Sequence, residues 1–298
     1  GDCTDTRFTH QDLVEREASI GRSWFRLQYQ LDTTLSDADK YPLKTSDFIV
    51  HDLDDLKGPI SISYSSSRSS YMEDIPNIGF TGDQFYRAGH VDSEYVPYEY
   101  AIMSIDPSGR GRDETGYSVI KQLHGKIFIS EVGGLLGGYT PENLTKMAMI
   151  AKKHQCKLLV VESNFGDGMF SELLKPVLRS IYPCSIEEVR NNKQKEMRII
   201  DVIEPLLNSH KLVIDASLVR NDIKEALADY TRLPYSLIHQ LTHISKDRGS
   251  LGHDDRLDAL SMSLGFIVES VGVSSEDALA RYKEEQLDAD LERFMQGI

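Results

Sequence analysis

The chain has 298 residues, of which 40% are hydrophobic and 27% are charged, a composition typical of globular proteins. Its formal net charge of −14 at pH 7 argues against a protein that coats nucleic acid non-specifically, because such binding is mainly electrostatic. An enzyme that acts on nucleic acid is not excluded, since carboxylates that hold cations add negative charge at the reaction site while short basic loops bind phosphates.

The cysteines and the distribution of hydrophobic residues indicate the cellular location of the chain. The three cysteines, Cys3, Cys156 and Cys184, are odd in number and far apart, so we expect neither a disulfide framework nor a structural zinc site, and a reducing cytoplasm as location. The N-terminus lacks the basic and apolar regions of a signal peptide. No hydrophobic run approaches the roughly 18–20 residues of a membrane span.

The first part of the chain shows little regular patterning. Residues 1 to about 60 are polar, with one short helix predicted within residues 6–30. The serine-rich residues 58–77 alternate only weakly between polar and apolar side chains and predict a strand or a loop. We expect three regions: an N-terminal extension (1–95), a main domain (96–272) and a charged, amphipathic, helical C-terminal tail (273–298).

From about residue 99 the pattern predicts regular elements. Three strands come first, at residues 99–106, 117–123 and 127–135, with the turn of a hairpin at residues 124–126. The helix that follows has Thr140 as its N-cap and Pro141 at its first position. Further strands are predicted at 157–163, 185–190 and about 211–214, and further helices at 169–183, 195–208, 217–233 and 251–272. This order predicts an α/β domain with a mixed sheet flanked by helices.

Acidic residues stand at the ends of two of these strands and at the start of the last helix. Asp106 ends the first strand and Glu162 ends the strand after the first helix. In open α/β sheets, ligands gather beyond the carboxyl ends of the strands. Asp254, Asp255 and Asp258 lie in the segment "LGHDDRLDALSMSLGF", where spacings of three and four residues allow pairs of them to face one direction.

Carboxylates from separate elements that meet at one point repel each other unless cations lie between them. Ligand sets made only of oxygen select hard ions, Mg²⁺ or Mn²⁺. Two such ions about 3.5–4 Å apart are a common device for cleaving phosphodiesters, in which one activates water and the other stabilises the leaving oxygen. The acids therefore predict a two-metal site.

Each acid also has a structural explanation when taken alone. Asp106 precedes Pro-Ser-Gly, where an aspartate often belongs to a turn. Glu162 stands where a loop starts, and loop starts are often polar. Aspartates in the first turn of a helix interact favourably with the helix dipole. The order of two strand-end acids followed by helix-start acids, within this succession of elements, favours the metal site.

The motifs "SIDPSGRGRDETG", "LLVVESNFGDG" and "LGHDDRLDALSMSLGF" resemble the nuclease domain of the large terminase subunit of tailed bacteriophages, particularly the T7-like kind. The resemblance covers roughly residues 95–270. It implies a ribonuclease H-like fold and a metal-dependent endonuclease that cleaves concatemeric double-stranded viral DNA during genome packaging. It also implies as partners the packaging ATPase domain, the portal protein and the small terminase subunit, in the cytoplasm of the infected bacterial host.

Carried over to this sequence, the resemblance implies roles for single residues. Asp106 and Glu162 become metal ligands and catalytic residues. Asp254, Asp255 and Asp258 become candidate metal ligands, with Asp255 and Asp258 favoured as catalytic, while His253 is expected to stand beside the start of the helix. The expected DNA-binding residues are Arg110, Arg112, Lys193, Lys195, Arg198, Lys246 and Arg248, which would contact phosphates rather than bases. Any one of these cations could also be an ordinary surface residue.

The sequence departs from a complete terminase in one respect. It has no phosphate-binding G-x-x-x-x-G-K-[ST] loop, so we expect no ATPase activity and a chain that corresponds to the C-terminal half. Two alternatives remain open: a resolvase or integrase-type enzyme on the same fold, and a non-catalytic module that docks on the portal or capsid.

Overall fold

The computed structural model describes residues 40–80, 82–108, 113–163, 168–190 and 193–270. The chain divides into two compact units, Gly1–Pro42 and Leu43–Ile298. Only residues 40–42 of the first unit are described. The fold and the site lie in the second unit.

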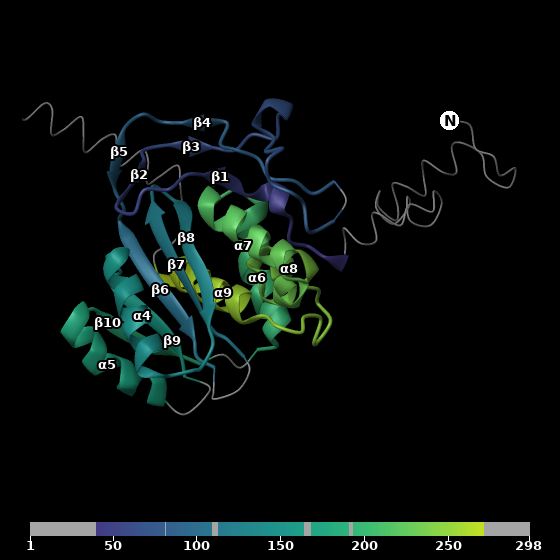
Figure 1. The fold of residues 1–298 in the computed structure, drawn as a ribbon. Coiled ribbons are helices and arrows are strands. Elements are labelled where there is room, and N and C mark those ends of the chain that lie inside the picture. The colour runs from purple at the N-terminus through teal and green to yellow at the C-terminus, as the bar shows by residue number, and fades with distance from the viewer. Residues whose placement is uncertain (1–39, 81, 109–112, 164–167, 191–192, 271–298) are drawn as a thin grey trace, which may run out of the picture. The chain divides into compact units, whose positions relative to one another are not determined.

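A seven-stranded sheet forms the centre of the second unit, with strand order β1-β11-β8-β7-β6-β9-β10 (Figure 1). Strand β7 runs antiparallel to β6 and to β8, and the other neighbours are parallel, so the sheet is mixed, as predicted. The strands are β1 (Ile49–His51), β6 (Tyr100–Asp106), β7 (Thr115–Leu123), β8 (Lys126–Leu135), β9 (Leu158–Glu162), β10 (Ser185–Val189) and β11 (Leu212–Asp215).

Local signals explain several element boundaries. His124 and Gly125 have φ values of 46° and 74°, as a two-residue hairpin between β7 and β8 requires. The Thr140 side chain accepts a hydrogen bond from the backbone N–H of Asn143, which confirms the predicted N-cap. Predicted strands and helices from residue 99 onward agree with the structure to within about four residues, except that the helix predicted at 217–233 ends at Ala228.

Helices cover both faces of the sheet (Figure 1). Helices α4 (Pro141–Lys153) and α5 (Met169–Ile181) pack on one face. On the other face lie α6 (Lys195–Asn208), α7 (Ala216–Ala228), α8 (Leu237–His243) and α9 (Asp255–Ser270), with the 3-10 helix η3 (Tyr230–Tyr235) between α7 and α8. The sequence did not predict α8.

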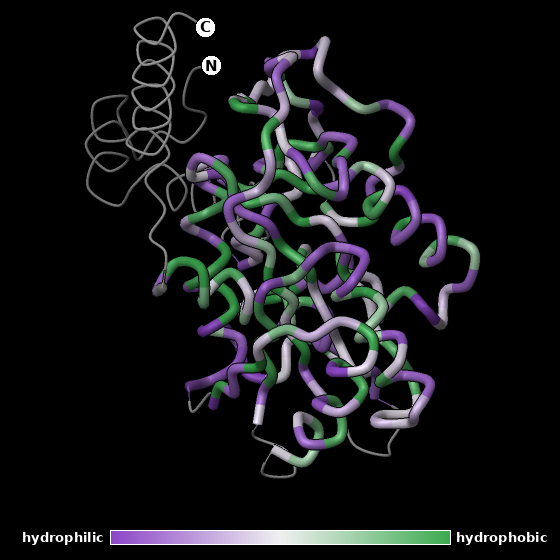
Figure 2. The backbone as a smooth tube through the Cα atoms, turned by 90° about the vertical axis from the view of Figure 1, so that its left-hand side faces the viewer, coloured by the Kyte–Doolittle hydropathy of each residue, from purple (hydrophilic) through white to green (hydrophobic). Residues whose placement is uncertain are grey.

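Alternation along the strands builds a core on each face. Met103 and Ile105 of β6 pack with α4 and α5, whereas Ile102 packs with the helices of the opposite face. Along the tube in Figure 2, hydrophobic and hydrophilic residues alternate at short intervals, as expected for elements that bury one side.

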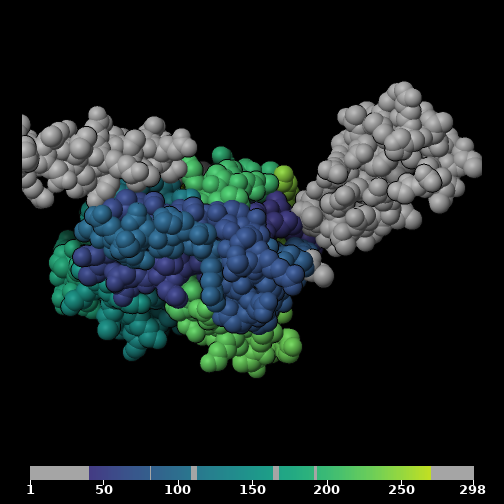
Figure 3. Space-filling view, turned by 90° about the horizontal axis from the view of Figure 1, so that it is seen from above, coloured from purple at the N-terminus to yellow at the C-terminus, as the bar shows by residue number. Residues whose placement is uncertain are grey.

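Residues 43–99 belong to the same compact unit as the sheet. Strand β1 pairs with β11, and two small antiparallel sheets follow, β2 (Lys57–Pro59) with β5 (Tyr95–Pro97) and β3 (Ile62–Ser63) with β4 (His90–Val91). In Figure 3 this segment, coloured purple to blue, covers much of the face toward the viewer. The 3-10 helices η1 (Thr45–Asp47) and η2 (Arg68–Ser70) complete it. The structure thus joins to the sheet a segment that the sequence assigned to an extension.

Two predicted elements, the helix within residues 6–30 and the tail 273–298, lie outside the described residues. Among the described residues, no helix has the length and hydrophobicity needed to cross a membrane.

Candidate metal-binding active site

Two neighbouring strands end in the acids that the sequence singled out. Asp106 is the last residue of β6 and Glu162 the last residue of β9. These strands are adjacent and parallel, with Ile105 paired to Val161, so both carboxylates stand at the same edge of the sheet. Two residues before Asp106, the Ser104 hydroxyl donates a hydrogen bond to the carbonyl of Ala259 in α9, at 2.6 Å. Since side chains two apart share a face, Asp106 points to the α9 side.

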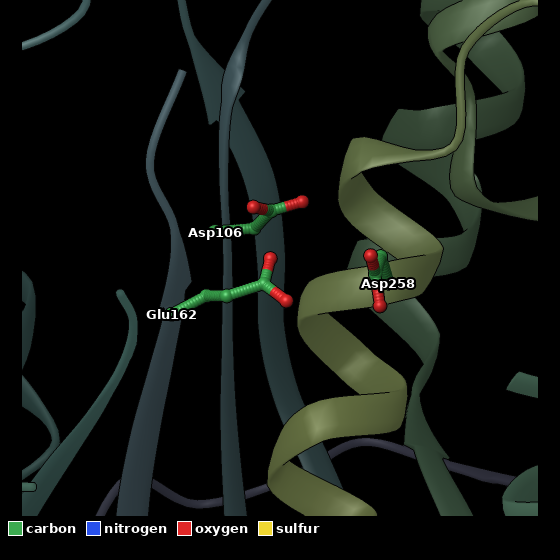
Figure 4. Close-up of side chains that lie close together, drawn as sticks. All are labelled: Asp106, Glu162 and Asp258. Atoms are coloured by element: carbon green, nitrogen blue, oxygen red, sulfur yellow. The ribbon is translucent and has the colours of Figure 1, made fainter. Parts of the chain in front are cut away.

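Asp258 completes this group from the first turn of α9. Asp106, Glu162 and Asp258 each place a carboxylate oxygen within 4.8 Å of the others, and Figure 4 shows the two strand-end side chains directed toward the helix. The structure therefore brings together three of the five predicted ligands. Asp254 and Asp255 are not members of this group among the described residues.

One of the three carboxylates, that of Asp258, is buried, and the other two are partly buried. Burial, and then the charges of Asp258 and Glu162, raise the pKa of Asp106 well above its ordinary value, although Lys195 acts in the opposite direction. Asp258 is 2% exposed. Neither of its side-chain oxygens accepts a well-aligned hydrogen bond from a described residue, although two cations lie within ion-pair distance. Two cations do not balance the charges of three carboxylates, so the site favours a further cation.

Lys195 and Arg198, which the sequence assigned to DNA, are those two cations. The Lys195 Nζ lies 2.8 Å from Asp254 Oδ1, 3.0 Å from Asp258 Oδ2 and 3.9 Å from Asp106 Oδ2. Burial lowers the pKa of Lys195, but the three aspartates outweigh it and hold that pKa above its ordinary value. Arg198 Nη2 lies 2.7 Å from Asp258 Oδ1. Both cations therefore compensate part of the negative charge of the acidic group.

Asp255 lies beside this group and approaches β7 through its backbone. A Cβ atom at Gly116 would stand 2.2 Å from the Asp255 carbonyl oxygen, so only glycine allows α9 to approach β7 this closely. Burial, and then the charge of Asp254, raise the pKa of Asp255 to about 6. The His253 ring stacks on Tyr235 at a centroid distance of 4.0 Å, which fits its predicted place beside the start of the helix.

A buried ion-pair network, which the sequence did not predict, fastens the start of α9. Arg256 Nε lies 3.0 Å from Glu114 Oε2, and Arg256 Nη1 lies 3.4 Å from Asp222 Oδ1. Glu114 is 1% exposed and also pairs with Arg232. Arg256 is visible in the motif "HDDRLD", but its partners lie 142 and 34 residues away, so no local pattern shows them.

Further cations lie on segments next to Glu162 and Lys195. Lys193, Lys246 and Arg248 are exposed, and their segments are linked, because the Gln194 side chain donates to the carbonyl of Lys246 at 3.2 Å. Arg190, which the sequence treated only as a strand end, donates through Nε to the Ser163 hydroxyl at 3.3 Å, next to Glu162. We call Arg190, Lys193, Lys246 and Arg248 the basic rim. Arg110 and Arg112 lie outside the described residues.

Two comparisons of the sequence with known proteins both point to phage terminases. Residues 105–212 match the family described as "Terminase Bacteriophage T7, Ribonuclease H-like domain". This region is a T7-type terminase ribonuclease H-like domain. The chain is also 39% identical to "Terminase, large subunit" of Enterobacteria phage T3 over 299 aligned residues, which cover 99% of this chain and 50% of the relative. The chain thus spans about half the length of that relative.

Two solved structures are similar at low identity. The human cytomegalovirus terminase nuclease domain, soaked with Mn and inhibitor-bound, has a TM-score of 0.43 at 13% identity and covers 59% of this chain and 85% of its own. The nuclease domain of the large terminase subunit gp2 of bacterial virus Sf6, with manganese and beta-thujaplicinol, has a TM-score of 0.42 at 11% identity, covering 56% and 88%.

The matched ribonuclease H-like region contains part of the acidic group. Asp106, Glu162 and Lys195 lie within residues 105–212, whereas Asp258 lies beyond them. Helix α9 brings Asp258 to the domain by packing on β6 and β7, where hydroxyl groups of Ser104 and Ser118 bond to its backbone. The site therefore depends on a helix outside the matched range.

Proposed function

We propose that this chain is a divalent-metal-dependent endonuclease that cleaves concatemeric double-stranded viral DNA during genome packaging. The observation that carries this is the convergence of Asp106, Glu162 and Asp258 on one point at a strand-end edge. The likeness to a phage terminase large subunit supports the packaging role. We also propose the host cytoplasm as location and the packaging ATPase domain, portal protein and small terminase subunit as partners.

The residues present fit Mg²⁺ or Mn²⁺. The donors are all carboxylate oxygens, the set that hard cations prefer. Asp106, Glu162 and Asp258 would hold the metal, with Asp254 and Asp255 as further candidates from the same helix start. When bound, a pair of such ions supplies an activated water and stabilises the leaving oxygen.

The protein's own cations would do two things in this reaction. Lys195 and Arg198 hold the Asp258 carboxylate from two sides, which orients it toward the strand-end acids. The basic rim would bind the phosphates of the DNA backbone, because its members are exposed lysines and arginines on segments next to Glu162 and Lys195. Interactions of this kind position DNA without reading its sequence.

Cleavage of supercoiled plasmid tests the proposal. Conversion to nicked and linear forms is expected with Mg²⁺ or Mn²⁺ and not with EDTA, because the chemistry requires the ion. Calcium serves as a control for metal binding without cleavage. It also binds oxygen ligands but with a looser geometry, so cutting is expected to be much weaker with calcium than with Mg²⁺ or Mn²⁺. Equal cutting with EDTA, or none with either ion, would contradict the proposal for this chain.

Removing the basic rim should weaken DNA binding in a salt-dependent way. The triple variant Lys193→Ala, Lys246→Ala, Arg248→Ala is expected to flatten the plot of log binding constant against log salt by roughly 0.9 for each phosphate that the protein no longer neutralises. Fluorescence anisotropy with a duplex in calcium would measure this. The exposed Lys224→Ala on α7 is the matched control. An unchanged slope in the triple variant would remove the rim from DNA binding.

A further inference from the structure

Residues of α5 and β10 line a groove, and Figure 1 shows these two elements at the margin of the sheet. Two adjoining cavities of about 700 and 370 Å³ form it, and they share Lys175 and Ile186. Strand β10 is the last in the sheet order and pairs only with β9 among the described residues. The groove is thus bordered by an open sheet edge.

The backbone of β10 presents hydrogen-bonding groups to this edge. The carbonyl of Val189 accepts from the N–H of Ser163, which follows β9. In a parallel ladder a residue directs its N–H and C=O to the same side, and the next residue directs them to the other. Ile186 and Glu188 therefore direct theirs outward, where a further strand would bond.

The charged side chains that line the groove differ between its two ends. Gly168, Glu172, Lys175 and Arg179 recur at spacings of four, three and four residues, so they form one stripe of α5. Lys157 and Arg179 lie at the end where β10 begins. At the other end lie Glu188 and Glu172, and Glu172 forms an ion pair with Lys175. A Cβ atom at Gly168 would stand 2.9 Å from Glu188 Oε1. Glu188 therefore sets the charge of this end.

This charge pattern indicates the kind of partner. DNA is unsuited to the groove, because its phosphates would meet the carboxylate of Glu188 at one end. A polypeptide can match both ends, with acidic side chains toward Arg179 and basic ones toward Glu188. Ile186 is half-buried between the two ends, so an apolar side chain suits the middle.

We propose that the groove binds an extended segment of a partner protein, which adds to the sheet as a strand beside β10. Backbone hydrogen bonds to Ile186 and Glu188 provide affinity, and the two charged ends provide selection. This proposal does not depend on the nuclease activity, because the groove uses none of the residues assigned to cleavage.

Synthetic peptides on the full chain test the proposal. The probes are fluorescent Asp-Asp-Val-Thr-Val-Thr-Lys-Lys and its reversed sequence, which cover parallel and antiparallel addition, with an interleaved peptide of the same composition as control. One charge-segregated peptide is expected to bind at least about tenfold more tightly than the control. N-methylation of every second residue of this peptide removes the N–H groups on one side of the strand. Of the two peptides that can be made in this way, the one methylated on the side toward β10 should lose the advantage in affinity.

Arg179→Glu is the matching protein variant, because Arg179 is exposed and its replacement leaves the core intact. Arg179→Glu is expected to weaken the binding of the charge-segregated peptide by about tenfold. Lys224→Glu, in α7 on the opposite face of the sheet, should not change that affinity. Thermal melting checks that both variants are folded. Equal binding of all peptides, no binding by either segregated peptide, or insensitivity to Arg179→Glu would overturn the proposal. Plasmid cleavage by Arg179→Glu should stay as in the parent chain.

Discussion

Asp106→Asn is expected to reduce metal-dependent plasmid cleavage by about a thousandfold or more. Loss of a residue that merely orients a metal ligand typically costs 10–100-fold, and Asp106 would be a ligand itself. Asparagine keeps the shape of the side chain but removes the charge that holds a cation. Asp201→Asn, at an exposed position of α6, is the matched control and should cut as the parent chain does.

The same variant should change how metal-free stability depends on pH. Because the folded-state pKa of Asp106 is raised, its contribution to stability is complete below the ordinary value of 3.8 and is lost as pH rises through the raised value. In EDTA the parent chain should therefore lose stability relative to Asp106→Asn as pH rises. Asp255, with a pKa of about 6, titrates in both chains and cancels in the comparison.

With Mn²⁺ the parent chain should become more stable than Asp106→Asn, because a bound ion stabilises only the chain that binds it. Thermal melting between pH 5 and pH 8 (roughly the range in which most proteins are stable), with EDTA and with Mn²⁺, measures both effects. Undiminished cutting by Asp106→Asn would place the chemistry elsewhere. Equal stabilisation of both chains by Mn²⁺ would mean that the ion binds away from Asp106.

Arg256→Ala is expected to lower the free energy of unfolding by about 3–5 kcal/mol, the usual cost of removing one partner from a buried ion pair. The variant removes the cation that lies between Glu114 and Asp222, which are both buried. Glu114 keeps its pair with the half-buried Arg232, and Asp222 keeps its hydrogen bonds from Ser236, Leu237 and Ile238. Arg248→Ala removes an exposed arginine from the loop before the same helix and should change the free energy by no more than about 0.5 kcal/mol.

A double replacement separates two contributions to this loss of stability: the attraction within the ion pair, and the cost of leaving one buried carboxylate without its cation. Arg256→Met with Glu114→Gln removes both charges of the closest pair while keeping similar volumes, so it should be less destabilised than Arg256→Ala. Urea unfolding followed by circular dichroism measures all three variants. A loss below about 1 kcal/mol for Arg256→Ala would mean that solvent reaches the network and screens it.

The sequence alone determined the order of the elements and the positions of the strand-end acids. Strand β9 is a short apolar run that ends at Glu162, and the helix after it repeats its apolar residues at helical spacing; these signals are local and survive without tertiary information. The hairpin turn at Gly125 and the cap at Thr140 are local for the same reason. The mixed sheet follows from that order.

Only the tertiary structure decided which residues meet. The sequence favoured Asp255 and Asp258 over Asp254 but did not separate the first two. The packing of α9 on Gly116 places Asp258 with Asp106, 152 positions apart by their numbers. Lys195 looks like a surface cation until α6 brings it against those carboxylates. Tertiary packing likewise pairs Glu114 with Arg256 and strand β1 with strand β11. The pairing of distant segments depends on how faces pack, and no local pattern carries that information.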